Sequence, residues 1–309
     1  MSTAGVKAKV RVGDLVFSKT ASFAGVGILI TLAAVAVFLF IQALPALDPN
    51  ADFAGKAEDP LSYVAPYVFG TLYGSVIALL IATPLAIGIA LYISHFAPRR
   101  FSQTLGYVID LLAAIPSVVY GLWGILVLAP FLNPTYVWLN ENLGWIPLFA
   151  GQVSATGRTM LTVGIVLAIM VLPIMAALIR EVFLQTPRLH EEAALALGAT
   201  RWEMIKMAVL PFGRPGIISA MMLGLGRALG ETMAVALVLS PASIISFALL
   251  TSQNSNTIAA NIALDFPESG GDYRSLLIAT GLMLFFITMV INMLARYIIS
   301  RRAEFSGAN

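Results

Sequence analysis

Six apolar stretches, each long enough to cross a lipid bilayer as a helix, constrain this sequence more than any other feature. A spanning helix needs about 20 apolar residues, and the uncharged runs 20–47 and 60–94 both exceed that length. Only 11% of the chain is charged, against about 25% in a soluble domain. The sequence therefore predicts an all-α polytopic membrane protein. We expect transmembrane helices at about 21–44, 67–93, 105–132, 159–179, 216–239 and 275–295.

The distribution of basic residues predicts the orientation of these helices. If the N-terminus is cytoplasmic, 14 of the 18 Lys and Arg residues fall in inner segments, and three fall in outer segments. Because cytoplasmic loops carry the excess of Lys and Arg, we expect both termini to be cytoplasmic. The expected organisation is a basic segment at 1–20, a transmembrane domain at 21–300 and a tail at 301–309. The first apolar run is longer than a signal-peptide core and is expected to be a retained anchor.

The segments expected on the outer side are acidic. They contain eight Asp and Glu residues against three basic residues, so this face repels anions. An anionic substrate would then need another component to deliver it.

The long inner segment 180–215 has the pattern of two short helices. Thr186 is expected to cap a helix that starts at Pro187, and Gly198 is expected to end that helix in a left-handed conformation. Such a hairpin suits either docking of a partner protein or binding to the inner leaflet, and the residues alone leave both interpretations open.

The second helix of this segment has its own start and stop signals. Thr200 and Glu203 have the spacing of a capping box, and Pro211 is expected to end the helix.

Two charged residues interrupt the fifth apolar stretch. An arginine near the bilayer centre costs about 2.5 to 3.5 kcal/mol, so Arg227 is expected to have a function. Glu231 follows four residues later and is expected on the same helix face. The two residues either contact an anion on a translocation pathway or form a self-neutralising pair that holds helices together. Gly226 and Gly230 have the spacing that allows close helix packing.

The inner segment also contains a motif that resembles the EAA loop of ABC-importer permeases. Its pattern, EAA-x3-G-x9-I-x-L-P, is matched from Glu192 to Pro211, except that Ala208 replaces the usual isoleucine. The resemblance implies that this loop docks into an ATP-binding subunit. The residues that it assigns to ATPase coupling are Glu192, Ala193, Ala194, Gly198, Trp202, Leu210 and Pro211.

The chain lacks the motifs of an ATPase. No G-x-x-x-x-G-K-[ST] phosphate loop occurs in the sequence, so ATP hydrolysis is expected in a separate subunit. We expect no enzyme activity of the chain itself, no cofactor, no metal site and no nucleic-acid partner.

Two further stretches, GLGRALGETMAV (224–235) and IPSVVYGLWG (115–124), closely resemble the phosphate-specific ABC permeases. Met233 and Ala234 favour the C-type over the A-type subunit. The resemblance implies a type I importer fold in a bacterial cytoplasmic membrane. It also implies an A-type permease partner, two ATP-binding subunits and an external phosphate-binding protein. The alternatives are a permease for another oxyanion and a secondary anion transporter.

Two acidic residues inside predicted helices lead to separate hypotheses. Glu231 could accept a hydrogen bond from phosphate, which carries a proton at neutral pH, and so discriminate against sulfate. Asp110 either reaches the membrane interface or pairs with a cation at an inner gate.

Overall fold

The computed structural model describes residues 12–53 and 55–303 and is mostly helical. Within these residues, six helices are long and apolar enough to cross a membrane, which confirms the predicted number. Their bounds are Gly13–Leu47, Pro60–Phe96, Ser117–Leu143, Met160–Leu184, Arg201–Leu229 and Gly271–Tyr297.

Twelve α-helices and a few short elements make up these spans and their connections in the described ranges. The helices are α1 (Val12–Ala43), α2 (Pro60–Leu91), α3 (Arg99–Ala113), α4 (Ser117–Trp123), α5 (Ala129–Leu143), α6 (Met160–Leu184), α7 (Arg188–Ala196), α8 (Arg201–Met204), α9 (Leu210–Leu229), α10 (Met233–Val238), α11 (Ile258–Asp265) and α12 (Gly271–Ala303). Single 3-10 turns lie at Leu44–Leu47 and Phe266–Glu268, and π-helical turns at Tyr92–Phe96, Gly124–Leu128 and Ile205–Val209. Strands β1 (Pro241–Ala242) and β2 (Asn254–Ser255) pair in parallel, with Pro241 opposite Asn254.

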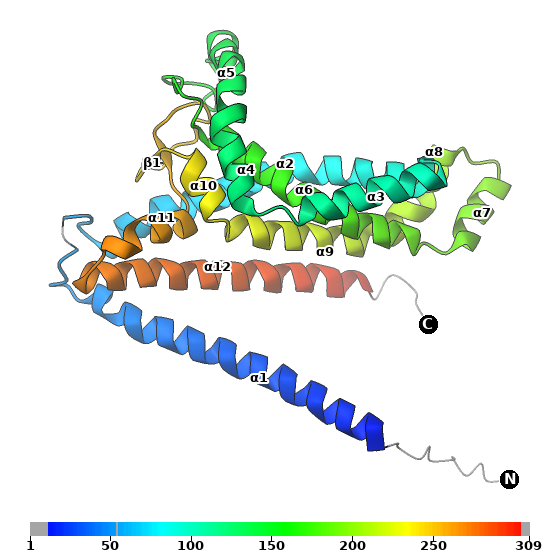
Figure 1. Cartoon of the computed structure of the whole chain (residues 1–309), viewed down its shortest axis with the longest axis horizontal. Coiled ribbons are helices and arrows are strands. Elements are labelled where there is room, and N and C mark those ends of the chain that lie inside the picture. The colour runs from blue at the N-terminus through cyan, green and yellow to red at the C-terminus, as the bar shows by residue number, and fades with distance from the viewer. Residues whose placement is uncertain (1–11, 54, 304–309) are drawn as a thin grey trace.

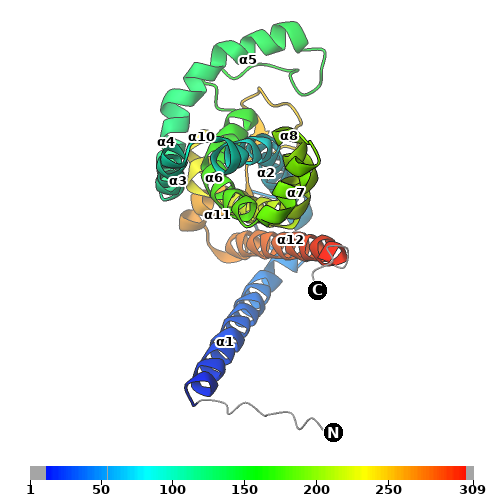
Figure 2. The same cartoon turned by 90° about the vertical axis from the view of Figure 1, so that its right-hand side faces the viewer.

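Helix α6 is the centre of the bundle. It contacts α2, α3, α9 and α10, and 67% of its apolar window is buried, against 0% for that of α1. Helices α2, α6, α9 and α12 run along one direction, whereas α1 touches α12 near one end and then diverges (Figures 1 and 2). The core therefore consists of α2, α6 and α9, and α1 is peripheral.

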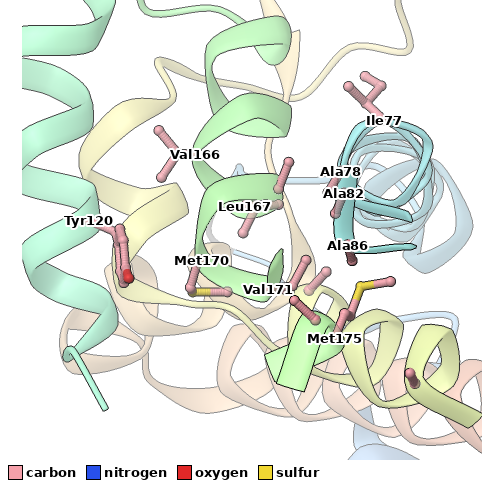
Figure 3. Close-up of a cluster of buried hydrophobic side chains, with 14 of the residues drawn as sticks. Ile77, Ala78, Ala82, Ala86, Tyr120, Val166, Leu167, Met170, Val171 and Met175 are labelled. Carbon is pink, nitrogen blue, oxygen red and sulfur yellow. The ribbon is translucent and has the colours of Figure 1, made fainter. Parts of the chain in front are cut away.

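A row of alanines lets α2 approach α6 closely. Ala78, Ala82, Ala86 and Ala90 recur every four residues, so they share one face of α2, and none of them is exposed. Met170 and Met175 of α6 belong to the same buried cluster, shown in Figure 3. Small residues at such a contact favour close van der Waals packing of membrane helices.

Side-chain caps define the starts of three helices. Asp59 accepts a hydrogen bond from the Ser62 backbone N–H at 2.7 Å at the start of α2, and this bond lowers the pKa of the Asp59 carboxyl. Thr159 caps α6 and Thr257 caps α11 in the same way.

The two ends of the bundle differ in structure. Helices α7 and α8, the start of α1 and the end of α12 lie at one end, which we call the coupling end (Figure 1). Helices α10 and α11 and the strand β1 lie toward the opposite end, which we call the loop end. Between α10 and α11, irregular backbone is held by side chains of α2: Tyr67 hydrogen-bonds Ser243 at 2.8 Å, and Tyr73 donates to the Phe247 carbonyl at 2.8 Å.

The third predicted helix, 105–132, is not continuous. Helix α3 ends at Ala113, and α4 begins at Ser117. Pro116 lacks a backbone N–H and disfavours the helical conformation of the preceding residue, which explains the break. Helix α3 lies along α6, whereas α4 and α5 project across the bundle direction (Figure 1).

The fifth predicted helix, 216–239, is shifted toward the N-terminus. Helical structure runs from Arg201 to Leu229, so the prediction that Pro211 ends a short helix is wrong. A π-helical turn at Ile205–Val209 ends two residues before this proline. The wider turn accommodates a residue that cannot donate a backbone hydrogen bond.

Candidate functional site

A helix break separates the two charged residues of the fifth stretch. Arg227 lies in the last turn of α9, whose C-cap is Gly230, and Glu231 precedes the six-residue helix α10. The expectation that both residues share one helix face is therefore wrong. In the described part of the chain they form no ion pair within 4.0 Å. Each charge instead suits its own helix end, because cations are favoured at C-termini and anions at N-termini.

Glu231 is a buried capping residue. Its Oε1 accepts a hydrogen bond from the Ala234 backbone N–H at 3.1 Å, and the residue is 8% exposed. This bond satisfies one of the backbone donors that a helix start leaves unpaired. The carboxylate therefore fixes the start of α10.

Arg158 binds the opposite end of α10. Its Nη2 donates to the Leu239 carbonyl at 3.0 Å and to the Leu237 carbonyl at 3.4 Å, and its Nε donates to Val238 at 3.3 Å. Arg158 is one of the three basic residues that the charge pattern places in outer segments, and this role was not predicted. No local pattern indicates it, because the contact joins residues 79 to 81 positions apart.

Two glycines of the IPSVVYGLWG stretch make room for α10. A Cβ at Gly121 would lie 2.8 Å from the Cα of Ala234. A Cβ at Gly124 would lie 2.7 Å from Val166 and 3.0 Å from Val238. Any larger residue at either position would collide with α10 or α6, so these glycines allow α4 and α10 to touch.

Arg227 faces a groove between α6, α9 and α12. The groove has a volume of about 700 Å³. Its lining residues are Ile174, Ser219, Met222, Leu223, Gly226, Arg227 and Asn292. Within the described residues, the buried Nε of Arg227 has no hydrogen-bond partner. A buried donor without a partner is costly and calls for an explanation.

The two glycines beside Arg227 make no close packing contacts within this chain. Among the described residues, a Cβ at Gly226 would meet nothing within 4 Å, and one at Gly230 would meet only the Gly226 carbonyl at 3.6 Å. Close packing on α6 is made by Gly224 instead, where a Cβ would lie 2.6 Å from the Met175 sulfur. Close helix packing at Gly226 and Gly230 is therefore not made within the described chain and stays a prediction.

The hairpin of α7 and α8 has most of its predicted local structure. Gly198 has φ +85° and follows α7, as expected for a left-handed stop. The capping box is confirmed: Glu203 N–H donates to Thr200 Oγ1 at 3.3 Å, and Thr200 N–H donates to Glu203 Oε2 at 2.8 Å.

The predicted cap by Thr186 is wrong. Helix α7 begins at Arg188, one residue later than expected, and the Thr186 hydroxyl is buried without a partner among the described residues.

The hairpin presents apolar side chains at its surface. Leu189 is 76% exposed and Leu197 is 90% exposed. Glu192 and Ala193 are also exposed, whereas Ala194 packs partly against the core. On α8 and the start of α9, Trp202 and Pro211 are exposed and Leu210 is half-buried. Exposed apolar side chains concentrated on one short hairpin are typical of an interaction surface.

Two further contacts lie toward the coupling end. His95 Nε2 lies 3.4 Å from Glu191 Oε1, which joins the end of α2 to α7. Asp110 and Arg180 line the same groove of about 290 Å³, together with Gly106. In the described structure these two side chains form no ion pair within 4.0 Å. Of the two alternatives for Asp110, pairing with a cation is therefore not made with this neighbouring arginine.

These features together define a class of protein. Six spanning helices, a broken helix with an arginine facing a groove and an exposed hairpin at one end are the features of a multi-span transport permease. The chain belongs to the family of binding-protein-dependent transport system inner membrane components, whose family model matches residues 82–304.

Relatives in sequence and in structure agree with this family. The chain is 45% identical to the phosphate transport system permease protein PstC 2 of Mycobacterium tuberculosis, over 93% of this chain and 92% of that protein. It is 39% identical to PstC of Mesorhizobium japonicum, over 96% of this chain and 92% of that protein.

Two solved transporters share the fold. A chain of a bacterial alginate ABC transporter, in complex with its alginate-bound periplasmic protein, has a TM-score of 0.64 at 18% identity, covering 94% of this chain and 95% of that chain. A chain of the MetNI methionine ABC transporter has a TM-score of 0.52 at 14% identity, covering 77% of this chain and 94% of that chain.

Proposed function

We propose that this chain is a membrane-spanning subunit of an ATP-driven phosphate importer and forms half of its translocation pathway. The observation that carries the proposal is Arg227, which lines the groove of α6, α9 and α12 and whose buried Nε has no hydrogen-bond partner among the described residues. A guanidinium has the planar donor geometry that suits a tetrahedral oxyanion. The names of the relatives support phosphate as that oxyanion.

The proposed partners are an A-type permease, two ATP-binding subunits and an external phosphate-binding protein. A second permease suits the exposed groove, because a half-pathway on one chain needs a covering surface. The ATP-binding subunit would dock on the exposed hairpin formed by α7 and α8, where Leu189 and Leu197 are uncovered. The binding protein would deliver the anion to an outer face whose acidic charge repels it.

The proposed orientation places the coupling end in the cytoplasm of a bacterial cell. The start of α1, the end of α12 and the hairpin share this end (Figure 1). The excess of basic residues in the corresponding segments favours a cytoplasmic position. The protein then binds no ATP itself, and the energy of hydrolysis reaches the membrane helices through the hairpin.

Phosphate uptake into vesicles that contain the assembled complex tests the proposal. With ATP inside, we expect uptake by the wild type, and loss of uptake with intact assembly and ATP hydrolysis in Arg227→Gln. Arg227→Lys is the matched variant, since it retains a positive charge without the planar donors. Uptake that needs an ion gradient but not ATP would instead support a secondary transporter. Unchanged uptake by Arg227→Gln would remove Arg227 from the pathway.

A further inference from the structure

One face of α12 carries three polar residues at a spacing of four. Thr288, Asn292 and Arg296 lie on the same side of this helix, because residues four apart are neighbours on a helix surface. Asn292 and Arg296 are exposed in the described chain, and Thr288 is partly exposed. An asparagine facing lipid is unfavourable, whereas Arg296 lies near the end of its span, Gly271–Tyr297, where an arginine reaches the membrane interface. The face around Asn292 therefore favours water or another protein beside it.

The polar face of α12 is continuous with the groove that contains Arg227. Asn292 lines that groove, and it also lines a second hollow of about 500 Å³. The second hollow is bordered by Phe285, Thr288, Met289, Asn292, Met293 and Arg296. The two hollows therefore adjoin at Asn292, with Arg227 among the lining residues of the first and Arg296 among those of the second.

The direction of this groove follows from the two helices that line it. Helix α9 begins near the coupling end and α12 ends there (Figure 1). Ser219 precedes Arg227 by eight residues, so it lies about 12 Å closer to the coupling end along α9. Arg296 lies about 6 Å beyond Asn292 in the same direction along α12. The polar groups thus run from the helix break toward the coupling end.

We propose that Asn292 and Arg296 form a second oxyanion contact on the exit side of Arg227. This proposal rests on the proposed transport function and adds the route by which the anion leaves. Conduction requires sites that bind weakly enough to release their ion to the next one. If no second binding site lay nearby, Arg227 would hold the anion. Asn292 and Arg296 would provide that second site, because their side-chain donors lie about one helix turn apart.

Single cysteines test whether this face borders an aqueous route, because the chain has no native cysteine. In the assembled complex in vesicles, we expect a water-soluble thiol reagent to label Asn292→Cys, and phosphate to slow the labelling. Leu294→Cys is the matched control, since Leu294 is exposed but lies two residues away and so on the opposite side of α12. Equal labelling of both positions, or labelling of neither, would overturn the aqueous route.

Charge variants test the anion contact itself. Arg296→Gln should lower phosphate uptake about tenfold, which corresponds to about 1.4 kcal/mol, and Arg296→Lys should keep most of it. Arg214→Gln, an exposed arginine of α9 outside the lining residues of both described hollows, should transport like the wild type. Wild-type uptake by Arg296→Gln would overturn the contact. If the wild type transports another oxyanion and not phosphate, the proposed substrate is wrong. The same variants then test the anion contact with that oxyanion.

Discussion

The Glu231 carboxylate and the Arg158 guanidinium bond opposite ends of one helix, α10. Glu231 accepts from the Ala234 N–H at the start of the helix, and Arg158 donates to three carbonyls at its end. Both charges have the sign that the helix dipole favours. A six-residue helix is too short to be stable by itself. The two side chains, together with packing on α4, therefore determine where α10 lies relative to Arg227.

The hydrogen bonds from Arg158 to the end of α10 predict a phenotype for variants of this arginine. Arg158→Gln removes the charge-assisted bonds to the carbonyls of α10, and hydrogen bonds to charged groups each contribute about 1.5 to 3 kcal/mol. We expect a lower midpoint of thermal unfolding in detergent and reduced phosphate uptake by the complex. Arg158→Lys should recover part of both, because it keeps a positive charge at the helix end. An unchanged unfolding midpoint and unchanged uptake in Arg158→Gln would show that Arg158 does not stabilise the end of α10.

Two substitutions of Glu231 separate capping from charge. Glu231→Gln keeps an oxygen that can accept from Ala234, whereas Glu231→Ala removes the acceptor and should cost about 0.5 to 2 kcal/mol of stability. We expect Glu231→Gln to stay folded. If Glu231 also accepts a hydrogen bond from phosphate, as the sequence hypothesis requires, this variant should transport sulfate as well as phosphate. Competition between the two anions in the uptake assay measures this. Unchanged selectivity in Glu231→Gln would show that Glu231 acts only on α10.

Three glycine-to-alanine variants test the packing around the helix break. Gly121→Ala and Gly124→Ala place a methyl group within 3.0 Å of α10 or α6 atoms. Overpacking of this kind costs about 1 to 3 kcal/mol, so we expect lower thermal stability of the isolated chain. Gly226→Ala is the matched variant, because its methyl group meets nothing within 4 Å in the described chain.

The same Gly226→Ala variant tests whether Gly226 packs against another subunit. If Gly226 packs against the second permease, the isolated chain should unfold like the wild type while assembly of the complex weakens. Normal assembly would remove Gly226 from that interface.

The hairpin at the coupling end depends on the backbone of Gly198. With φ at +85°, a β-branched residue is strained there, and no side-chain collision contributes, since a Cβ meets nothing within 4 Å among the described residues. We expect Gly198→Val to lower phosphate uptake per ATP hydrolysed, because α7 and α8 lose their relative position. Gly198→Asn should be nearly normal, since asparagine tolerates this conformation. Equal ratios of uptake to hydrolysis in both variants would contradict this role.

The sequence alone predicted those features that depend on neighbouring residues. Hydropathy determines the number of spanning helices, because a span requires one long apolar run. The capping box of Thr200 and Glu203 and the left-handed Gly198 were also correct, since each involves residues within one turn. Helix breaks were less predictable. Pro116 does break its helix, whereas Pro211 does not, because a π-helical turn precedes it.

Only the tertiary structure determined how the charged residues are used. Arg227 and Glu231 are close in sequence, yet the break after Leu229 directs one to a groove and the other to a helix cap. Arg158 reaches α10 from a segment about 80 positions earlier, and Asn292 reaches the groove of Arg227 from the last helix. Hydropathy and capping patterns record local preferences, whereas these contacts depend on how the helices pack. The sequence therefore determined the membrane class and the EAA-like motif, and packing alone placed Arg227 and Asn292 at one groove.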